Sequence, residues 1–329
     1  MKILLVCVHF HSSFGWSIER ALLRAGHEVL IFDYRHNPFR RFPGLRDTYA
    51  GRYMPARLLS AARAFKPNLI FIAKGELVPG DTIRALKDDL RCPAVNWFPD
   101  GRLFSYSNVM QQLPHLDFLF SKNLIDLERM RLLGIRNGRF LLHCADRELH
   151  TELVTTDSEL KPYLCQVAVV GSYYPFRDYI ISQLLDFDIR IWGPGWQRSM
   201  VSKKRGAIVG REARSSEQAK VFRAATINVN PHHFDDIGSL NQRVFDICGS
   251  GGCQLLDGYR KVDDVFAVPD DVDLFHSAEE LRDKVRKLIA SPERAREMGK
   301  HAREKTAAAH TYDHRIAEIF QLLNDELRM

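Results

Sequence analysis

Residues 238–252 read Gly-Ser-Leu-Asn-Gln-Arg-Val-Phe-Asp-Ile-Cys-Gly-Ser-Gly-Gly and are the most informative part of the chain. Ser239 followed by Gln242 fits a capping box, which predicts a helix over 240–248. The glycines after this helix would end it and permit close packing into the next strand. Apolar runs at 226–230 and 253–256 predict a strand on either side. A strand–helix–strand unit of this kind is typical of a parallel sheet.

The same alternation runs through the rest of the chain in two series. The first series has predicted strands at 3–8, 28–32, 68–73, 94–98, 117–120 and 139–142, with helices at 17–26, 55–65, 81–90 and 124–133 between them. The second has strands at 166–171, 188–192, 226–230 and 253–256, helices at 177–186, 216–224 and 240–248, and a helical end from about 278 with breaks near 291–292 and 309–311. The weakly periodic segment 147–163 is interpreted as a linker. We therefore predict an α/β protein with two Rossmann-like domains whose parallel sheets face each other across a cleft, which is the expected ligand site.

Composition and charge restrict the class of protein. The chain has 329 residues, a formal charge of +6 and a composition that is ordinary for a globular protein. Six scattered cysteines without a Cys-x-x-Cys pair indicate free thiols in a reducing cytoplasm, and no apolar run approaches the length of a membrane span. The sequence shows no coherent basic face, so it does not indicate nucleic-acid binding. The basic stretch Arg35–Arg46 is either a solvated loop or a patch for an anionic acceptor or a membrane surface.

Charged and hydroxyl side chains gather at predicted strand ends in the second series. Residues 239, 242, 243 and 246 share one face of the predicted helix, so Arg243 can contact a phosphate and Asp246 can accept two ribose hydroxyls. Ser172 and Arg177 follow the strand at 166–170 and would lie over the same edge of the cleft. The alternative is an amphipathic helix that ends in a glycine-rich turn.

Residues 166–320 resemble the C-terminal half of bacterial glycosyltransferases of the spore-maturation CgeB-like kind. The resemblance rests on a valine-rich strand with Gly-Ser and a downstream Arg, then Trp-Gly-x-Gly-Trp, Asn-x-Arg-x-Phe-acid with a Cys-Gly turn, and a closing His-Thr-Tyr-x-x-Arg. The matching positions are Gly171, Ser172, Arg177, Trp192, Gly193, Gly195, Trp196, Asn241, Arg243, Phe245, Asp246, Cys248, His310, Thr311, Tyr312 and Arg315. The N-terminal half matches more loosely, at Lys74-Gly75-Glu76, Trp97–Asp100 and Ala145-Asp146.

The resemblance implies the GT-B fold and transfer of a sugar from a UDP-, GDP- or dTDP-linked donor. Residues 1–155 would form the acceptor domain, 156–311 the donor domain, and a final helix at 312–329 would pack back on the acceptor domain. The donor-binding residues would be Ser172, Arg177, Trp196, Gly210, His232, Ser239, Asn241, Arg243 and Asp246. Trp196 is equally suited to core packing, and Gly210 to a plain turn. An acid that the wider superfamily often carries is replaced by Gly238, for which Asp235 or Asp236 would compensate.

The acceptor side and the chemistry are less specified. Candidate acceptor-binding residues are Ser13, Phe14, Gly15, Lys74 and Glu76. Asp100, His9 and His11 are candidates for the general base, and Asp100 is equally well explained as a turn residue. We expect a retaining, metal-independent reaction with no cofactor, because arginines can stabilise the leaving diphosphate. The acceptor is a glycan, a lipid-linked intermediate or a protein, and we expect a cytoplasmic location, with contact to the inner face of the membrane through Arg35–Arg46. The alternative function is that of a nucleotide-binding scaffold without catalysis.

Overall fold

The computed structural model describes residues 1–36, 52–233, 236, 238–258 and 262–327. The chain divides into two compact units. Residues Met1–Leu142 and Arg315–Met329 form unit 1, and His143–His314 form unit 2. Unit 2 thus starts before the boundary expected at 155/156, and most of the basic stretch Arg35–Arg46 lies outside the described residues. No helix in the described part of the chain is both long enough and apolar enough to span a lipid bilayer.

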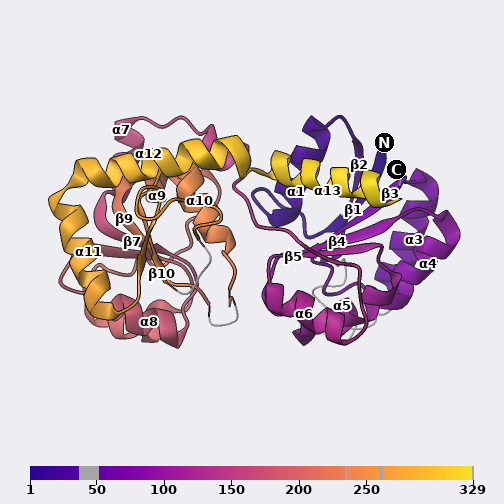
Figure 1. Cartoon of the computed structure of the whole chain (residues 1–329), viewed down its shortest axis with the longest axis horizontal. Helices are drawn as coiled ribbons and strands as arrows, with labels where there is room; N and C mark the ends of the chain where they lie inside the picture. Colours follow the sequence, from indigo (N-terminus) through magenta and orange to yellow (C-terminus); the bar gives the residue numbers. More distant parts are fainter. Residues whose placement is uncertain (37–51, 234–235, 237, 259–261, 328–329) are drawn as a thin grey trace. The chain divides into compact units, whose positions relative to one another are not determined.

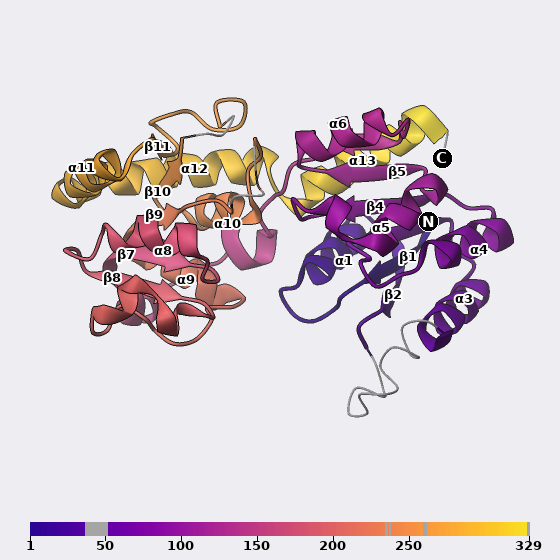
Figure 2. The same ribbon diagram turned by 90° about the horizontal axis from the view of Figure 1, so that it is seen from below.

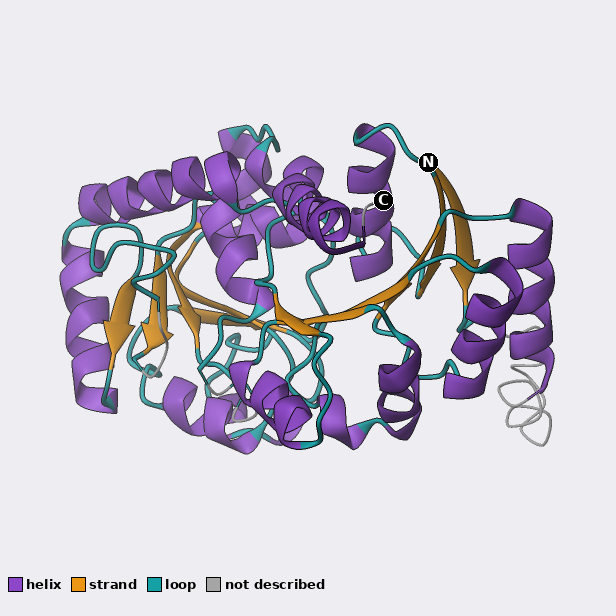
Figure 3. Cartoon of the chain, turned by 45° about the vertical axis from the view of Figure 1, so that its right-hand side comes forward, coloured by secondary structure: helices purple, strands orange, loops and turns teal. Residues whose placement is uncertain are grey.

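Unit 1 is a parallel sheet with helices on both faces (Figures 1 and 3). Its strand order is β2-β1-β3-β4-β5-β6. The strands are β1 (Lys2–Cys7), β2 (Glu28–Asp33), β3 (Leu69–Ala73), β4 (Ala94–Phe98), β5 (Phe118–Ser121) and β6 (Gly138–Phe140). The helices are α1 (Phe14–Arg24), α3 (Met54–Phe65), α4 (Gly80–Leu90), α5 (Ser107–Gln112), α6 (Leu124–Leu132) and the chain-terminal α13 (Tyr312–Leu327). The central strands β3 and β4 are buried along their whole length, as a sheet covered on both faces requires.

The last helix of the chain belongs to unit 1 from Arg315 onward, although unit 2 separates it in sequence from the rest of that unit. α13 lies against this unit in Figure 2, and Ile319 and Leu323 are fully buried. Phe320 stacks on His27, with ring centroids 4.5 Å apart. Unit 1 is therefore completed by a segment from the end of the chain.

Unit 2 has a five-stranded parallel sheet with the order β11-β10-β9-β7-β8. The strands are β7 (Cys165–Val170), β8 (Ile189–Trp192), β9 (Ala225–Asn230), β10 (Gln254–Asp257) and β11 (Asp273–Phe275). The helices are α7 (Asp157–Leu160), α8 (Pro175–Ser182), α9 (Ser216–Ala224), α10 (Gln242–Ser250), α11 (Ala278–Ala290) and α12 (Pro292–Ala309). The segment interpreted as a linker, 147–163, lies within this unit and includes a helical turn at Arg147–Thr151 and α7.

Alternate residues of β7 belong to two separate cores. Val167 and Val169 pack with residues of α8, α11 and α12, whereas Ala168 and Val170 pack with residues of α9 and α10. This division follows from the period-2 alternation of side chains along a strand, and it explains why the whole of β7 is apolar or small except Gln166. The two predicted Rossmann-like domains with parallel sheets are confirmed. The strand β11 and the helix α5 were not predicted.

Close packing of α12 on the end of α10 yields a stability prediction. A Cβ on Gly299 would lie 2.2 Å from the carbonyl oxygen of Gly251, which ends α10 in a left-handed conformation. Because backbone atoms cannot move away as a flexible side chain can, Gly299→Ala should destabilise unit 2 by about 1–3 kcal/mol. Urea unfolding of this variant and of Lys300→Ala, an exposed neighbour on α12, measures the effect. Equal midpoints for Gly299→Ala and the wild type would contradict the close approach.

Candidate functional site

The strand order of unit 2 marks the place where a ligand is expected. The order reverses between β7 and β9, so the loops that follow these adjacent strands lead away in opposite directions. Crevices of open α/β sheets form at such a point, outside the carboxyl ends of the strands. The loop after β7 leads to α8, and the loop after β9 leads to α10.

Arg177 joins the two loops at this switch point. Pro175 occupies the first turn of α8, a position that favours proline, and this places Arg177 in the same turn. Its guanidinium donates to the carbonyl oxygen of Ser172 at 2.8 Å and to that of Pro231 at 3.0 Å. These carbonyls follow β7 and β9 respectively. The guanidinium also lies 4.3 Å from the centroid of the Tyr174 ring.

No carboxylate of the described residues contacts the buried guanidinium of Arg177. The groups that touch its guanidinium among the described residues are two carbonyls and one aromatic ring, and its Nε is buried without a hydrogen-bond partner there. Burial lowers the pKa of Arg177, and the nearby Arg243 lowers it further, while Tyr174, Asp236 and Asp257 oppose this shift. A desolvated cation close to a second cation is costly unless an anion compensates. The arrangement therefore fits an anionic ligand.

The first turn of α10 differs from the prediction. The helix begins at Gln242 and its N-cap is Asn241, whose Oδ1 accepts from the amide of Val244 at 3.1 Å. The predicted cap Ser239 is wrong, because its hydroxyl is buried and makes no hydrogen bond to a described residue. Asn241 is held in turn by Asn230 at the end of β9, whose Nδ2 donates to Oδ1 at 3.2 Å.

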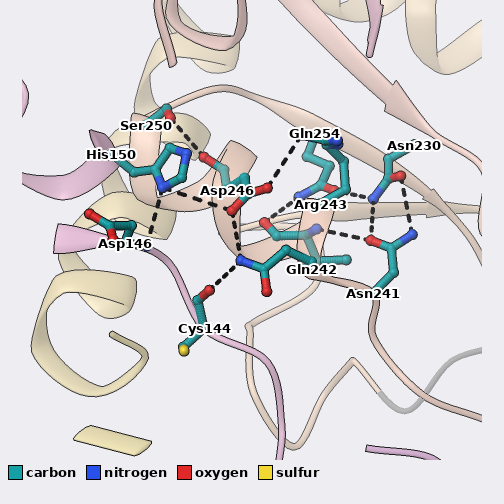
Figure 4. Close-up of polar contacts among 11 residues, drawn as sticks. Cys144, Asp146, His150, Asn230, Asn241, Gln242, Arg243, Asp246, Ser250 and Gln254 are labelled. Atoms are coloured by element: carbon teal, nitrogen blue, oxygen red, sulfur yellow. Dashed lines mark hydrogen bonds and ion pairs between the residues drawn. The ribbon is translucent and has the colours of Figure 1, made fainter. Parts of the chain in front are cut away.

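The side chains of Gln242, Arg243 and Asp246, which were predicted to share one face of α10, are neighbours in the structure (Figure 4). Arg243 Nη1 lies 3.3 Å from Asp246 Oδ2, and Gln242 Nε2 donates to Asp246 Oδ1 at 2.9 Å. Asp246 is buried, and burial lowers the pKa of Arg243 while Asp246 raises it. Only one of the five N–H donors of Arg243 is used in this contact with a described residue, so the others are able to bind an anion while the ion pair remains.

Two neighbours of Asp246 were missed by the sequence analysis. Gln242 was assigned to a capping box with Ser239, although its spacing of four residues from Asp246 predicts contact between these two side chains. His150 lies with its Nδ1 3.8 Å from Asp246 Oδ1 and accepts from the amide of Asp146 at 3.2 Å. No local signal identifies His150, because it comes from a segment far away in the sequence.

Three further donor-site candidates have mixed outcomes. His232 is fully buried, and its Nδ1 lies 2.6 Å from Oδ1 of Asp257, at the end of β10. Gly210 has a φ of +83° with open space around it, so this position is a turn that favours glycine. Trp196 was wrong as a stacking residue. It is fully buried and its indole N–H donates to the carbonyl of Gly171 at 2.9 Å, so it belongs to the core.

The switch point of unit 1 lies between β1 and β3, and the remaining candidates follow these strands. After β1, Ser13 caps α1: its Oγ accepts from the amides of Phe10 and Trp16, and donates to the carbonyl of Val8. Because the hydroxyl already makes these three hydrogen bonds, it has little capacity left to bind an acceptor substrate. Gly15 is required by packing, since a Cβ there would lie 2.6 Å from the carbonyl oxygen of Val8.

The aromatic and imidazole side chains of the same loop have defined neighbours. Phe14 packs edge-on against Trp97, with ring centroids 5.0 Å apart. His9 Nε2 lies 2.8 Å from Glu19 Oε2, and the ring of His11 lies 4.8 Å from that of Trp16. His9 thus has a carboxylate partner that orients its imidazole ring.

The loop after β3 holds two ion-paired candidates. Lys74 Nζ lies 2.7 Å from Asp100 Oδ2, so the candidate base is bound to an ammonium group. Burial opposes the charge on Lys74, yet Asp100 and Glu76 raise the pKa of Lys74 overall. Glu76 is buried and accepts from the hydroxyl of Tyr34 at 2.5 Å and from Arg35. Burial alone would raise the pKa of Glu76, but these donors lower it, which keeps the carboxylate ionised.

Buried amides hold this loop in shape and were missed by the sequence analysis. Lys74 and Gly75 both adopt a left-handed conformation, with φ of +69° and +70°. Gln112 on α5 donates to the carbonyls of Gly75 and Val78 at 2.8 and 2.7 Å, and Asn96 on β4 donates to that of Lys74 at 3.1 Å. These bonds satisfy the backbone carbonyls of an irregular loop and so hold its conformation.

The sequence Asp186-Phe187-Asp188 has the spacing of an Asp-x-Asp metal signature. Asp186, in the Asp186-Phe187-Asp188 sequence, is bonded to Arg282 instead. Within the described ranges, no group of three or more His, Cys, Asp or Glu side chains is arranged to hold a metal ion.

Comparison with known proteins supports the architecture. Residues 177–321 match a family described as glycosyl transferase-like. A search of curated proteins gave no match. A sucrose-phosphate synthase from Thermosynechococcus elongatus has a TM-score of 0.70 and 14% identity, covering 99% of both chains. Anabaena HepE in complex with UDP-glucose has a TM-score of 0.70 and 11% identity, covering 99% of this chain and 100% of that chain.

A third similar structure is a UDP-GlcNAc 2-epimerase from Neisseria meningitidis bound to UDP-GlcNAc. It has a TM-score of 0.60 and 11% identity, and the match covers 98% of this chain and 100% of that one. At such identities the likeness concerns the fold. With its two Rossmann-like units, the chain has the GT-B fold, and residues 177–321 match the glycosyl transferase-like family.

Proposed function

We propose that the protein is a glycosyltransferase, of the CgeB-like kind, that takes a nucleoside diphosphate sugar as its donor in unit 2. The observation that carries the proposal is the buried guanidinium of Arg177 at the switch point, with uncharged contacts and with Arg243 nearby. The diphosphate of a nucleotide sugar is an anion of the required charge. The glycosyl transferase-like match over 177–321 and the UDP-glucose held by HepE support this choice of anion.

The chemistry follows from where charge develops. In sugar transfer, negative charge accumulates on the leaving diphosphate and positive charge on the anomeric carbon. Arg177 and Arg243 would stabilise the diphosphate electrostatically, and buried cations do this more strongly than exposed ones. We therefore propose that transfer needs no divalent cation. A leaving phosphate that is stabilised in this way can also assist a retaining reaction without a strong protein base.

Ribose recognition is assigned to Asp246. Its carboxylate is buried at the first turns of α10 and would accept the two ribose hydroxyls. Gly238 replaces an acid that the wider superfamily uses on the donor sugar, and Asp236 is the described acid nearest in sequence.

The acceptor is proposed to bind in unit 1, near the loops after β1 and β3. His9, with its Glu19 partner, is better placed to accept a proton than Asp100, which is bound to Lys74. The hydroxyl acceptor belongs to a glycan, a lipid-linked intermediate or a protein, and unit 1 would bring it to a membrane surface in the lipid-linked case.

The test is a thermal-shift series with UDP, GDP, dTDP and the corresponding nucleosides, each with and without EDTA. Binding to the folded state raises the melting temperature by linkage, and about 2.7 kcal/mol of stabilisation is expected at a ligand concentration of 100 Kd. We expect one diphosphate to stabilise the protein, its nucleoside to do so far less, and EDTA to have no effect. No shift with any nucleotide would refute the proposal.

The second candidate is a nucleotide-binding scaffold that has lost catalysis, and Gly238 in place of an acid favours it. Incubation with the nucleotide sugar selected above distinguishes the two. A glycosyltransferase slowly hydrolyses its donor or transfers the sugar to added acceptors. A scaffold binds the donor and releases it intact.

A further inference from the structure

The side-chain amide of Gln242 joins the donor-site carboxylate to a second segment of unit 2. Gln242 Nε2 donates to Asp246 Oδ1 at 2.9 Å and to the carbonyl oxygen of Cys144 at 2.6 Å. Both partners are acceptors, so only the nitrogen of the amide fits between them. The orientation of the side chain is thereby determined, and both of its N–H groups are used.

The segment that contains Cys144 is itself held by hydrogen bonds of the two residues that follow the bonded carbonyl. The amide of Ala145 donates to the carbonyl of His310 at 2.9 Å, and the amide of Tyr312 donates to the carbonyl of Ala145 at 3.2 Å. Asp146 Oδ1 accepts from the amide of Leu149 at 3.0 Å. The carbonyl of Cys144 is therefore a fixed point and not a mobile loop atom.

α10 also packs tightly against this segment. A Cβ on Gly249 would lie 2.7 Å from the Cβ of Ala145 and 3.3 Å from that of His150. The helix that carries Asp246 and the segment that carries Cys144 thus have little freedom to move apart. Gln242 spans them at the level of the carboxylate.

Asp246 has few other side-chain partners. Among the described residues its side-chain oxygens contact Gln242 and Arg243, and His150 lies farther away at 3.8 Å. Arg243 reaches only Oδ2 of Asp246, at 3.3 Å, so the position of Oδ1 depends on Gln242. Gln242 is the uncharged partner whose hydrogen bond keeps one oxygen of Asp246 in place.

We propose that Gln242 is a positioning residue for ribose recognition. It holds Asp246 at a set distance from the Cys144 carbonyl, so that the carboxylate meets the 2′- and 3′-hydroxyls of a bound nucleotide. This inference rests on the proposed function of Asp246. Gln242 would then determine the preference of the protein for ribonucleotides over 2′-deoxyribonucleotides.

The experiment measures the dissociation constants of UDP and 2′-deoxy-UDP, or of the pair with the base selected by thermal shift. Wild type should prefer the ribonucleotide. Gln242→Met keeps the length of the side chain and removes both N–H donors, so the ribonucleotide affinity should fall about tenfold, as for the loss of a hydrogen bond to a charged group. The affinity for the 2′-deoxyribonucleotide should fall less, so the preference of the protein for the ribonucleotide should decrease.

Gln112→Met is the matched control. Gln112 is also a buried glutamine whose Nε2 donates to two acceptors, the carbonyls of Gly75 and Val78, but it lies in unit 1. Its loss should lower stability to a similar degree and leave the nucleotide ratio unchanged. If Gln242→Met does not fold, Gln242→Leu replaces it, because leucine is also uncharged, has a similar size and lacks the donors.

The outcomes separate the two proposals. A folded Gln242 variant that keeps the wild-type preference for the ribonucleotide overturns the positioning role of Gln242. If Asp246→Asn loses that preference, the proposed function stands without a role for Gln242. A wild-type protein that binds no nucleotide refutes the proposed function itself. A narrowed ratio in the Gln242 variant alone supports the role of Gln242.

Discussion

Replacing Arg177 by methionine should remove most of the affinity for the nucleoside diphosphate while the unliganded protein stays folded. The guanidinium is desolvated and already holds two carbonyls, so a phosphate that binds it gains a charge-assisted contact in a low-dielectric site. Losing one partner of such a buried pair typically costs about 2–5 kcal/mol, which corresponds to a factor of roughly 30 to several thousand in Kd.

The effect on the unliganded protein has two parts of opposite sign. Methionine removes the cost of burying a cation, and it removes the donor to the carbonyl of Ser172, whereas the carbonyl of Pro231 keeps the hydroxyl of Tyr174 as a donor. We therefore expect a small change in the melting temperature without ligand and a nearly complete loss of the shift that the diphosphate produces.

Calorimetry with the diphosphate and with the nucleoside makes the assignment specific. If Arg177 binds phosphate, the diphosphate loses affinity in Arg177→Met and the nucleoside does not. Arg177→Lys retains a charge without the forked geometry of a guanidinium, so its affinity for the diphosphate should lie between those of the wild type and Arg177→Met. An unchanged Kd for the diphosphate in Arg177→Met would remove the main support for the donor site.

The second large effect is expected for Asp246→Asn. The change keeps the shape of the side chain and removes the charge that two ribose hydroxyls and Arg243 would share. Hydrogen bonds to a charged group are worth about 1.5–3 kcal/mol each, so the loss of two of them predicts a fall in affinity of roughly a hundredfold or more. Donor turnover should fall with it, since an unheld nucleotide places its anomeric carbon poorly.

Asp186→Asn is the control for this variant. Asp186 lies in the same unit and is bonded to Arg282 at the surface, so the same substitution there should leave nucleotide affinity unchanged. It also tests the Asp186-Phe187-Asp188 sequence as a metal signature, because a metal ligand would make turnover sensitive to this change. Equal losses in both variants would mean that the effect of Asp246→Asn is a general loss of stability.

Much of the fold was predictable because the periodicity of apolar residues is a local property. The strands predicted at 94–98 and 226–230 agree with β4 and β9 to within a residue, and their alternation with helices implied parallel sheets. The prediction failed where two local solutions compete. Ser239 and Asn241 are both good N-cap residues, and the geometry of the Asn230 contact decides for Asn241.

The residues of the donor site were found from the sequence, but their partners were not. Arg177, Arg243 and Asp246 stand out because charged groups near strand ends and on one helix face are visible in the chain itself. Arg177 meets the carbonyl of Pro231, and Gln242 meets that of Cys144, only because β7 lies beside β9 and the first segment of unit 2 lies along α10. Trp196 shows the reverse case, since an aromatic residue near a strand end suits a ligand or a core equally, and its burial decides for the core. Hydrophobic periodicity thus determined the elements and the residue types at their ends. Strand order and helix packing, which local sequence does not encode, decided which charges are left uncompensated and which amide holds the carboxylate.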